Sequence, residues 1–315
     1  MASHIYKVFI DGQAGTTGLQ IHERLKNHDQ VEVLLIAPED RKDSEKKKLL
    51  MKEADVTFLC LPDEAAKEAV ELAKDVSCRI IDASSAHRCA EGWVYGLPEL
   101  NVTQREAIKS AQFVANPGCY ATGALLLLAP LLQNKMLSPD HHVSITGVSG
   151  YSGGGNGLIA QYEEQDNPSS FGIYGLDLNH KHIPEILKWS GLTHKPTFVP
   201  AVANIKQGMF VYFTLDQDAL LKPITSVPEI YQTAYQNEKV VRFDETSLNY
   251  PERFKYIEGI QNQNLCEISC FPSADGAQAL VLAKLDNLGK GASGAAVQNM
   301  NIMLSLPEHL GSTLS

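Results

Sequence analysis

One cysteine of this chain stands where a strand is expected to turn into a helix, a position that suits a reactive thiol. It is Cys119, in the segment VANPGCYATG that covers residues 114–123. The residues before it predict a strand ending at Asn116, a Pro-Gly pair turns the chain, and residues 121–132 are expected to be helical. A helix dipole stabilises a thiolate at the helix N-terminus. Cys119 is therefore the candidate nucleophile of a covalent mechanism.

The other five cysteines are expected to be small packing residues. They are Cys60, Cys78, Cys89, Cys266 and Cys270. No pair has the two-residue spacing of a zinc knuckle or a redox dithiol, so we expect no metal site. Free thiols spread in this way are typical of a reducing compartment, and the cytoplasm is the expected location.

A glycine-rich turn near the N-terminus predicts a nucleotide site. The turn consists of Gly12, Gln13, Ala14, Gly15, Thr16, Thr17 and Gly18. It lies between an expected strand at 7–11 and an expected helix at 19–26. Glycines here let the backbone approach a phosphate, and the free N–H groups at the helix start favour a pyrophosphate. The spacing is G-x-x-G-x-x-G, which differs from the usual G-x-G-x-x-G fingerprint.

The end of the second expected strand, residues 31–36, bears on the choice between NAD and NADP. An acid at this place usually bonds the ribose 2′-hydroxyl of NAD, whereas a cation suits the 2′-phosphate of NADP. Arg41 and Lys42 follow the strand, with two acids close by. We take these two cations as cofactor contacts and expect NADP. The basic run at 46–48 is expected to be only a solvated helix face.

The elements around these motifs predict an α/β protein. Its 315 residues, 44% of them apolar, are enough for two domains with substantial cores. Short strands alternate with helices up to about residue 120, which is typical of a Rossmann-type doubly wound parallel sheet. These strands are expected at 7–11, 31–36, 56–61, 79–82 and 112–115. Longer alternating strands at 142–148, 209–214 and 280–285 predict a second, α+β domain with a mixed or antiparallel sheet, and a last helix is expected at 292–304.

Charge and hydropathy argue against two classes of partner. The chain has 27 basic and 37 acidic residues, a formal net charge of −10, and no clustered basic face for nucleic acid. The longest apolar stretch, 124–132, contains a proline and is far shorter than the roughly 18–20 residues that span a bilayer. We therefore expect neither a nucleic acid nor a membrane as partner.

The motif Gly-Tyr-Ser-Gly-Gly at 150–154 suggests a competing class, a serine hydrolase that uses Ser152. Such a nucleophile elbow needs a helix directly after the serine, and the glycine-rich residues 153–157 are expected to start a helix poorly. A substrate-contacting loop is favoured instead. A non-catalytic, NADP-binding sensor is a further alternative, because it would keep the glycine turn and need no nucleophile.

The segment around Cys119 resembles the active-site signature of the N-acetyl-γ-glutamyl-phosphate reductases, in particular their short, type 2 branch. Further similar segments lie at 11–18, 82–88, 93–99, 148–155, 180–185 and 286–299. That family is built like aspartate-semialdehyde dehydrogenase. The resemblance implies an NADP-binding Rossmann domain at 1–118, completed by a C-terminal helix within 288–315. It also implies an inserted α+β catalytic and oligomerisation domain at 119–287.

The resemblance implies an NADPH-dependent reductive dephosphorylation of N-acetyl-L-glutamyl 5-phosphate to the 5-semialdehyde, a step of arginine biosynthesis. Cys119 would attack the acyl carbon, phosphate would leave, and the thioester would then be reduced. A related reductase for aminoadipyl phosphate or aspartyl phosphate is the alternative. The family also implies a homo-oligomer, a tetramer or a dimer, that acts on a small-molecule acyl phosphate.

Two histidines are candidates for the acid/base group. His180 and His182 precede an expected helix start, and on an extended segment they would point the same way. We favour His182 and keep His180 as the alternative.

Lys181 stands where many family members have arginine, which puts a bidentate carboxylate grip in question. Arg88 is the candidate for binding the substrate carboxylate or phosphate. The remaining contacts are expected from Ser84 to the cofactor and from Asn116, Ser149, Gly150, Lys181 and Glu185 to the substrate.

Overall fold

The computed structural model describes residues 4–313; Met1–Ser3 and Leu314–Ser315, the ends of the expected nucleotide domain, lie outside the described residues. The chain divides into two compact units. Unit 1 comprises Met1–Pro98, Val102–Gly118 and Ala292–Ser315. Unit 2 comprises Glu99–Asn101 and Cys119–Gly291, so it is inserted in sequence between parts of unit 1. Each unit is described by itself.

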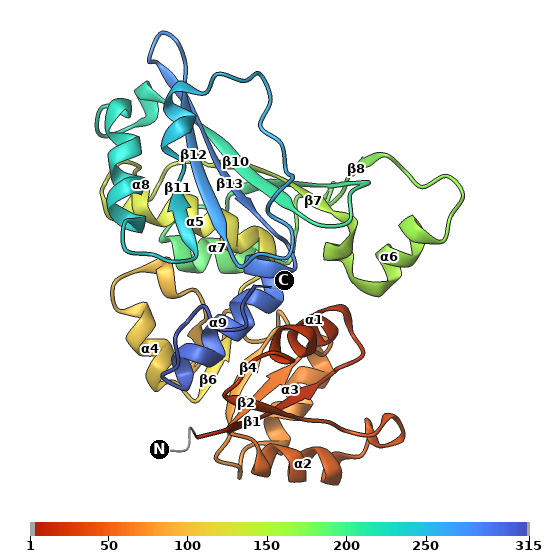
Figure 1. The fold of residues 1–315 in the computed structure, drawn as a ribbon. Coiled ribbons are helices and arrows are strands. Elements are labelled where there is room, and N and C mark those ends of the chain that lie inside the picture. The colour runs from red at the N-terminus through yellow and green to blue at the C-terminus, as the bar shows by residue number, and fades with distance from the viewer. Residues whose placement is uncertain (1–3, 314–315) are drawn as a thin grey trace. The chain divides into compact units, whose positions relative to one another are not determined.

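Unit 1 contains six parallel strands in the order β2-β1-β3-β4-β6-β5 (Figure 1). The strands are β1 (Tyr6–Asp11), β2 (Val31–Leu34), β3 (Val56–Leu59), β4 (Arg79–Asp82), β5 (Val94–Tyr95) and β6 (Phe113–Ala115). The helices are α1 (Thr16–Leu25), α2 (Ser44–Glu53), α3 (Asp63–Leu72), α4 (Gln104–Ser110) and α9 (Gly294–Met303). The predicted α/β class with a Rossmann-type parallel sheet is confirmed; the short edge strand β5 was not predicted.

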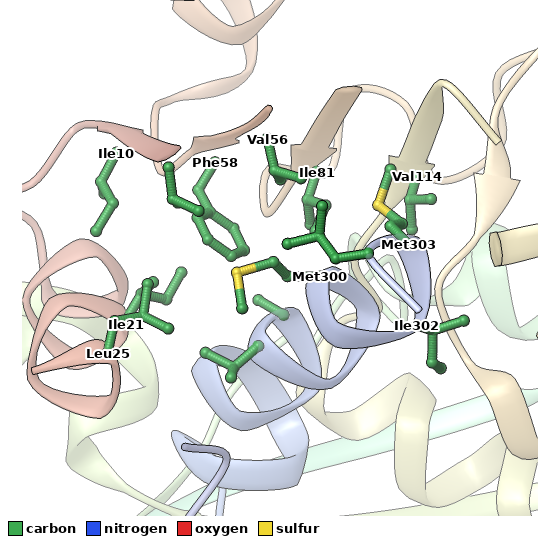
Figure 2. Close-up of a cluster of buried hydrophobic side chains, with 14 of the residues drawn as sticks. Ile10, Ile21, Leu25, Val56, Phe58, Ile81, Val114, Met300, Ile302 and Met303 are labelled. Carbon is green, nitrogen blue, oxygen red and sulfur yellow. The ribbon is translucent and has the colours of Figure 1, made fainter. Parts of the chain in front are cut away.

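Both faces of this sheet are buried, because successive residues of a strand point to opposite faces. Figure 2 shows the cluster between the strands and helices α1 and α9. It includes Ile10, Phe58, Ile81, Ile21 and Met300. The cluster on the opposite face joins the strands to α2 and α3, and includes Phe9, Leu59, Ile80, Met51 and Ala69. The last helix of the chain, α9, is therefore part of the core of unit 1.

Unit 2 contains seven strands in the order β11-β12-β13-β10-β7-β9-β8. They are β7 (Ser144–Gly150), β8 (Phe171–Ile173), β9 (Thr197–Ala203), β10 (Met209–Asp216), β11 (Val241–Phe243), β12 (Cys266–Pro272) and β13 (Gln278–Leu285). The pairs β7/β9 and β11/β12 are parallel and the others antiparallel, which confirms the predicted mixed sheet. The helices are α5 (Cys119–Gln133), α6 (Gly155–Glu163), α7 (Ile183–Ser190) and α8 (Val227–Tyr235).

Short helical turns connect these elements. The 3₁₀ turns are η1 (Pro38–Asp40), η2 (Pro98–Leu100), η3 (Tyr151–Gly154), η4 (Gln217–Ala219), η5 (Ile224–Ser226) and η6 (Glu245–Asn249). A π-helical turn, η7 (Gly289–Ser293), leads into α9. Turns of the π type often mark functional sites.

Helix α5 is the central element of unit 2. Twelve of its fifteen residues are buried, as expected for a helix that is apolar on every side. It packs against α7, α8 and strands β10, β12 and β13. Pro130 lacks the N–H that would bond the carbonyl of Leu126, and the Tyr235 hydroxyl donates to that carbonyl at 2.6 Å instead. Among the described residues no helix, α5 included, has the length and hydropathy to span a membrane.

We predict that Gly123→Ala destabilises unit 2 by about 1–3 kcal/mol, because the added methyl overpacks the interface between α5 and β10. That methyl would lie 2.7 Å from Cγ2 of Val211. The overpacking opposes the gain of about 1 kcal/mol in helix propensity that alanine brings. Urea unfolding measures the change. Val211→Ala should cost less in the Gly123→Ala protein than alone, and equal costs would contradict the contact.

Candidate functional site

The glycine turn of unit 1 follows β1 and is built from close backbone contacts. Gly12 has φ of +89°, and a methyl group there would overlap the carbonyl of Cys60. A methyl on Gly18 would overlap the carbonyl of Gly12. The N–H of Gly15 donates to that same carbonyl at 3.0 Å, and α1 begins at the next residue. The turn thus has the glycine geometry of a phosphate-binding helix start, at the carboxyl end of the strand where the sheet order reverses.

The residues beside Gly12 are tied to their surroundings. Gln13 donates from Nε2 to the carbonyl of Ile36 at 3.0 Å. Asp11 is buried, and its Oδ2 lies 2.9 Å from Nζ of Lys47 on α2. Burial raises the pKa of Asp11, while Lys47 lowers it. The expectation that the run 46–48 is only a solvated face is therefore wrong for Lys47, whose position on α2 brings it to the sheet.

The two cations expected to bind the 2′-phosphate lie on the surface of unit 1. Arg41 and Lys42 are both exposed and follow η1. Arg41 donates from Nε to the carbonyl of Pro38 at 2.9 Å. One of the neighbouring acids, Asp40, is paired with Lys46 at 2.6 Å. In the turn itself Ala14 is exposed, while Thr16 and Thr17 are half-buried.

Ser84 belongs to a loop that closes on Asp82 at the end of β4. Asp82 accepts from the backbone N–H of Ser84 at 2.8 Å and from its hydroxyl at 2.7 Å. The same carboxylate lies 2.6 Å from Nδ1 of His87. The His87 ring stacks on Trp93, with centroids 4.2 Å apart. This network holds the loop that carries Arg88.

Arg88 and Asn116 lie together in unit 1. Arg88 is buried and donates from Nε to the carbonyl of Asn116 at 3.0 Å and from Nη2 to that of Ala83 at 3.1 Å. Asn116 donates from Nδ2 to the carbonyl of Ala292 at 3.0 Å, and its Oδ1 accepts from Asn299 at 3.1 Å. Both residues therefore also hold the backbone that leads to the Pro-Gly turn.

Cys119 is the first residue of α5 and belongs to unit 2. The helix begins two residues before the predicted start at 121. Cys119 is half-buried, and a methyl on Gly291 would lie 2.7 Å from its Cβ. The thiol therefore lies in the field of a helix N-terminus, and Cys119 is next to Gly291, which has no side chain.

Aromatic and imidazole rings gather around Tyr120, the neighbour of Cys119. The centroid of its ring lies 5.8 Å from His180 and 6.0 Å from His182. The centroids of the two imidazoles are 4.6 Å apart, edge to face. The backbone N–H of His182 donates to Nδ1 of His180 at 3.1 Å. The expected extended segment is wrong, because His182 has φ −86° and ψ −11° in a turn. That turn nonetheless brings both rings to Tyr120.

Two tyrosine hydroxyls continue this cluster. Tyr120 donates to the carbonyl of Ala201 at 2.8 Å, and Tyr174 donates to the Tyr120 oxygen at 3.3 Å. Burial raises the pKa of Tyr174 to about 12 and that of Tyr120 further still. Both phenols are therefore neutral near physiological pH and act as hydrogen-bond donors rather than as bases.

A buried carboxylate stands beside the second histidine. Oε1 of Glu185, on α7, lies 3.9 Å from Nε2 of His182, and both side chains are almost fully buried. The two groups are placed to form an ion pair whenever the imidazole is protonated. Lys181, the residue before His182, is exposed.

Ser149 and Gly150 end strand β7. The Ser149 hydroxyl is buried and donates to the carbonyl of Gly150 at 3.0 Å. A methyl on Gly150 would lie 2.7 Å from the carbonyl oxygens of Ile205 and Lys206, so the position requires glycine. These contacts fix the backbone at the end of β7.

The expectation that the glycines after Ser152 would not form a helix is wrong. Ser152 lies in η3, and α6 begins at Gly155 directly afterwards. Gly155 has φ of +73°, a conformation that its lack of a side chain permits. Ser152 is nevertheless buried, 1% exposed, and its hydroxyl accepts from Nδ2 of Asn287 at 2.9 Å. This is a structural serine and not the exposed nucleophile of an elbow.

The other five cysteines do not all pack as expected. Cys78, Cys266 and Cys270 are buried and Cys60 is half-buried. Burial raises the pKa of each of these thiols, to about 12 for Cys270. Cys89 is exposed, so its expected packing role is wrong. It follows Arg88 in a loop whose fold depends on the hydrogen bonds of Asp82 and not on apolar burial.

Several residues of these sites were not singled out from the sequence. Tyr120 and Tyr174 join the histidines, and Asp82 holds the loop of Arg88. Asp82 could have been noticed as a polar residue at the carboxyl end of a parallel strand, the edge where ligands bind in open α/β sheets. Tyr174 belongs to no motif, so only the fold reveals it. Among residues 4–313 no group of three or more His, Cys, Asp or Glu side chains could hold a metal ion.

Both units match known families. Residues 119–287 match the family described as "Semialdehyde dehydrogenase, dimerisation domain". Residues 7–111 match "Semialdehyde dehydrogenase, NAD binding domain". These two matches correspond closely to the two compact units.

Full-length relatives and solved structures extend this similarity. The N-acetyl-gamma-glutamyl-phosphate reductase of Trichormus variabilis is 48% identical over 97% of this chain and 98% of its own. The protein of that name from Mesorhizobium japonicum is 41% identical over 95% and 99%. Aspartate semialdehyde dehydrogenase II of Vibrio cholerae superposes with a TM-score of 0.71 at 13% identity, over 96% and 99%. The Candida albicans enzyme, solved with NADP, has a TM-score of 0.65 at 12% identity, over 95% and 98%. These structures show the shared fold.

We predict that iodoacetamide at pH 7–8 alkylates Cys89 and Cys119 in the folded protein and spares the other four cysteines. Their raised pKa values leave less thiolate, and burial denies the reagent access. Peptide mass spectrometry measures the labelling. A Cys89→Ser protein should be labelled at Cys119 alone, and labelling of Cys266 or Cys270 at a comparable rate would contradict the assignment.

Proposed function

The chain belongs to the N-acetyl-gamma-glutamyl-phosphate reductase family, and we propose that it reduces N-acetyl-L-glutamyl 5-phosphate to N-acetyl-L-glutamate 5-semialdehyde with NADPH. This reaction is a step of arginine biosynthesis. The observation that carries the proposal is Cys119, the first residue of the buried helix α5, in a chain that matches its relatives over nearly their full length.

The glycine turn of unit 1 fits the cofactor. Side chains at Gly12 and Gly18 would overlap backbone carbonyls, so the glycines permit the tight turn that leads into the start of α1. We propose that the pyrophosphate is held by residues 12–18, with Ser84 as a further contact. Arg41 and Lys42 would bind the 2′-phosphate, which makes NADP the expected cofactor. When bound, NADPH supplies the hydride that adds to the acyl carbon.

Cys119 acts as the nucleophile in this proposal. Its thiolate attacks the acyl carbon, a C–S bond forms, and the C–O bond to phosphate breaks. The thioester keeps the acyl group activated for reduction. The thiohemiacetal that results on Cys119 then loses its C–S bond, which releases the semialdehyde and returns the thiolate. Backbone N–H groups at the start of α5 stabilise the oxyanion during these steps.

His182 is proposed as the acid/base group. Its imidazole takes the thiol proton before attack, supplies a proton to the oxyanion during reduction, and takes that proton back as the C–S bond of the thiohemiacetal breaks. The carboxylate of Glu185, 3.9 Å away, stabilises the imidazolium between these events. His180 remains the alternative, because its ring contacts both His182 and Tyr120.

Charged and polar residues are proposed to recognise the substrate. Arg88 supplies a positive charge for the carboxylate or phosphate of the substrate. Asn116, Ser149, Gly150, Lys181 and Glu185 are the further contacts proposed. A related reductase for aminoadipyl or aspartyl phosphate is the alternative, since one methylene in a pocket changes binding by only about 1–3 kcal/mol.

We propose that the protein works as a cytoplasmic homo-oligomer, a dimer or a tetramer. Support for self-association comes from unit 2, whose residues match a family described as a dimerisation domain. None of the six cysteines, all of which lie in the described part of the chain, is in a disulfide, which supports a reducing compartment.

We predict that N-acetylglutamate semialdehyde, phosphate and NADP together produce NADPH, because the reaction is reversible. Absorbance at the nicotinamide band measures it, and NAD should be the poorer acceptor. Cys119→Ala should lose turnover below detection while its melting temperature and NADP binding stay unchanged. The matched Cys89→Ala protein should keep full activity.

Other outcomes of this assay would point elsewhere. Robust turnover by Cys119→Ala would sink the covalent mechanism. Turnover only with the substrate one carbon longer would move the assignment to the aminoadipyl reductases. NADP binding without turnover of any acyl phosphate would favour a sensor, and labelling of Ser152 by a fluorophosphonate would favour a hydrolase.

We predict that His182→Gln slows turnover about 10²–10⁴-fold, the usual contribution of a positioned acid/base group. The wild-type rate should fall at low pH, because a protonated imidazole cannot accept the thiol proton. In His182→Gln this acidic limb should move to higher pH, because the thiol must then lose its proton without a neighbouring base. Rates from pH 5 to 9 measure the position of the limb. His180→Gln is the matched control, and the same displacement of the limb in that variant alone would exchange the two roles.

A further inference from the structure

A lysine and a glutamate form a buried ion pair in unit 2 that the proposed reaction does not use. Nζ of Lys290 lies 2.8 and 2.9 Å from the two carboxylate oxygens of Glu99, and both side chains are fully buried. Moving two charges out of water is costly, and apolar residues of similar volume often replace such a pair without loss of stability. Stability alone is therefore a weak reason for its presence.

The turn that carries Lys290 is pressed against the start of α5. The N–H groups of Gly289 and Gly291 donate to the carbonyl of Asp286 at 3.1 and 2.9 Å. A methyl on Gly291 would lie 2.7 Å from Cβ of Cys119 and 3.3 Å from its Cα. The backbone of Gly291 thus packs directly on Cys119 with no side chain between them.

The beginning of this turn is fixed by Asp286. Its carboxylate accepts from the N–H of Leu288 at 3.0 Å, from that of Asn262 at 2.6 Å and from Nε2 of Gln207 at 3.2 Å. Gly289 also lies against the carbonyl of Gln263, so closely that a side chain would overlap it. Lys290 comes next in the chain, and its ion pair with Glu99 attaches the turn to a further segment of unit 2.

We propose that Lys290 and Glu99 are positioning residues for Cys119: their ion pair holds the turn 289–291 so that Gly291 limits where the thiol can lie. This rests on the proposed function, in which Cys119 is the nucleophile. A lysine ammonium that binds both oxygens of one carboxylate holds the two side chains in a defined geometry, and the ion pair as a whole carries no net charge. The pair should therefore affect turnover through the geometry of the thiol and not through its ionisation.

The contact between Gly291 and Cys119 can be tested without any turnover. Gly291→Ala should lower the midpoint of thermal unfolding. The same change in a Cys119→Gly protein should lower it much less, because residue 119 then has no Cβ for the added methyl to contact. Gly172→Ala is the matched control, since its methyl would be 4.0 Å from Val202. Equal shifts in both backgrounds would overturn the proposed contact.

The ion pair is tested in the full-length protein with Lys290→Met combined with Glu99→Leu, in a Cys89→Ser background. We expect kcat to fall on the order of 100-fold with little change in KM, as for a small misplacement of a reacting group. The pH midpoint for alkylation of Cys119 by iodoacetamide should stay where it is. The exposed pair on α3, Lys67→Met with Glu64→Gln, is the control and should change neither quantity.

Each other result counts against the proposal. An unchanged kcat would make the pair merely structural, and a shifted alkylation midpoint would make its effect electrostatic. Lys290→Arg, with Glu99 retained, keeps the ion pair and should have a kcat between those of the double variant and the wild type. A kcat as low as that of the double variant would also contradict a positioning role. If the double variant does not fold, this arginine variant and the Gly291→Ala comparison still decide. A wild-type protein without turnover would instead refute the proposed function.

Discussion

The burial of α5 beneath the sheet of unit 2 is the constraint on which the thiol site depends. The helix is apolar on every side, so it cannot leave the core without exposing apolar surface. Gly123 lets it approach Val211 of β10, and Tyr120 lies against Gly147 of β7 in the same way. A helix held so closely has a fixed N-terminus. Cys119 occupies that terminus, with Gly291 against its Cβ, while the histidines and Tyr174 contact the neighbouring Tyr120.

The missing side chain of glycine serves both units through the same physical effect. In unit 1, Gly12 and Gly18 bring one stretch of backbone against another in the turn that leads into α1. In unit 2, Gly291 brings backbone against the candidate nucleophile itself. At these positions the contact is made by backbone atoms, which have less conformational freedom than a side chain. Geometry of that precision is what positioned catalysis requires.

The sequence predicted those features that depend on neighbouring residues. Strands β1, β3 and β4 and helix α5 follow from short apolar runs and turn residues, and they led to the correct fold class. The correct family came instead from the resemblance of the segment around Cys119. The network of Asp82, His87 and Trp93 and the pair of Lys290 with Glu99 depend instead on residues that only the folded chain brings together. Lys290 and Glu99 are 191 residues apart, so no local pattern could indicate them.

Local expectations failed where tertiary contacts outweighed composition. Helix α6 begins within a run of glycines because Gly155 takes a conformation that other residues rarely adopt, and Ser152 before it is held by Asn287. Lys47 looked like one of three solvated lysines, yet its place on α2 brings it to Asp11. Cys89 was expected to pack, but hydrogen bonds and not apolar burial organise its loop.

The charge of the chain shows why such pairings matter for the proposed ligands. The net charge of −10 opposes an anionic cofactor and an anionic substrate, so the local field must differ from the average. Asp11 stands directly before the glycine turn and would repel a pyrophosphate as a bare carboxylate. Burial raises its pKa, and the ammonium of Lys47 lies 2.9 Å from the carboxylate. The pairing with Lys47 reduces the negative charge at this place, because the ammonium compensates the carboxylate. The start of α1 can then offer its N–H groups to a phosphate without a competing anion beside it.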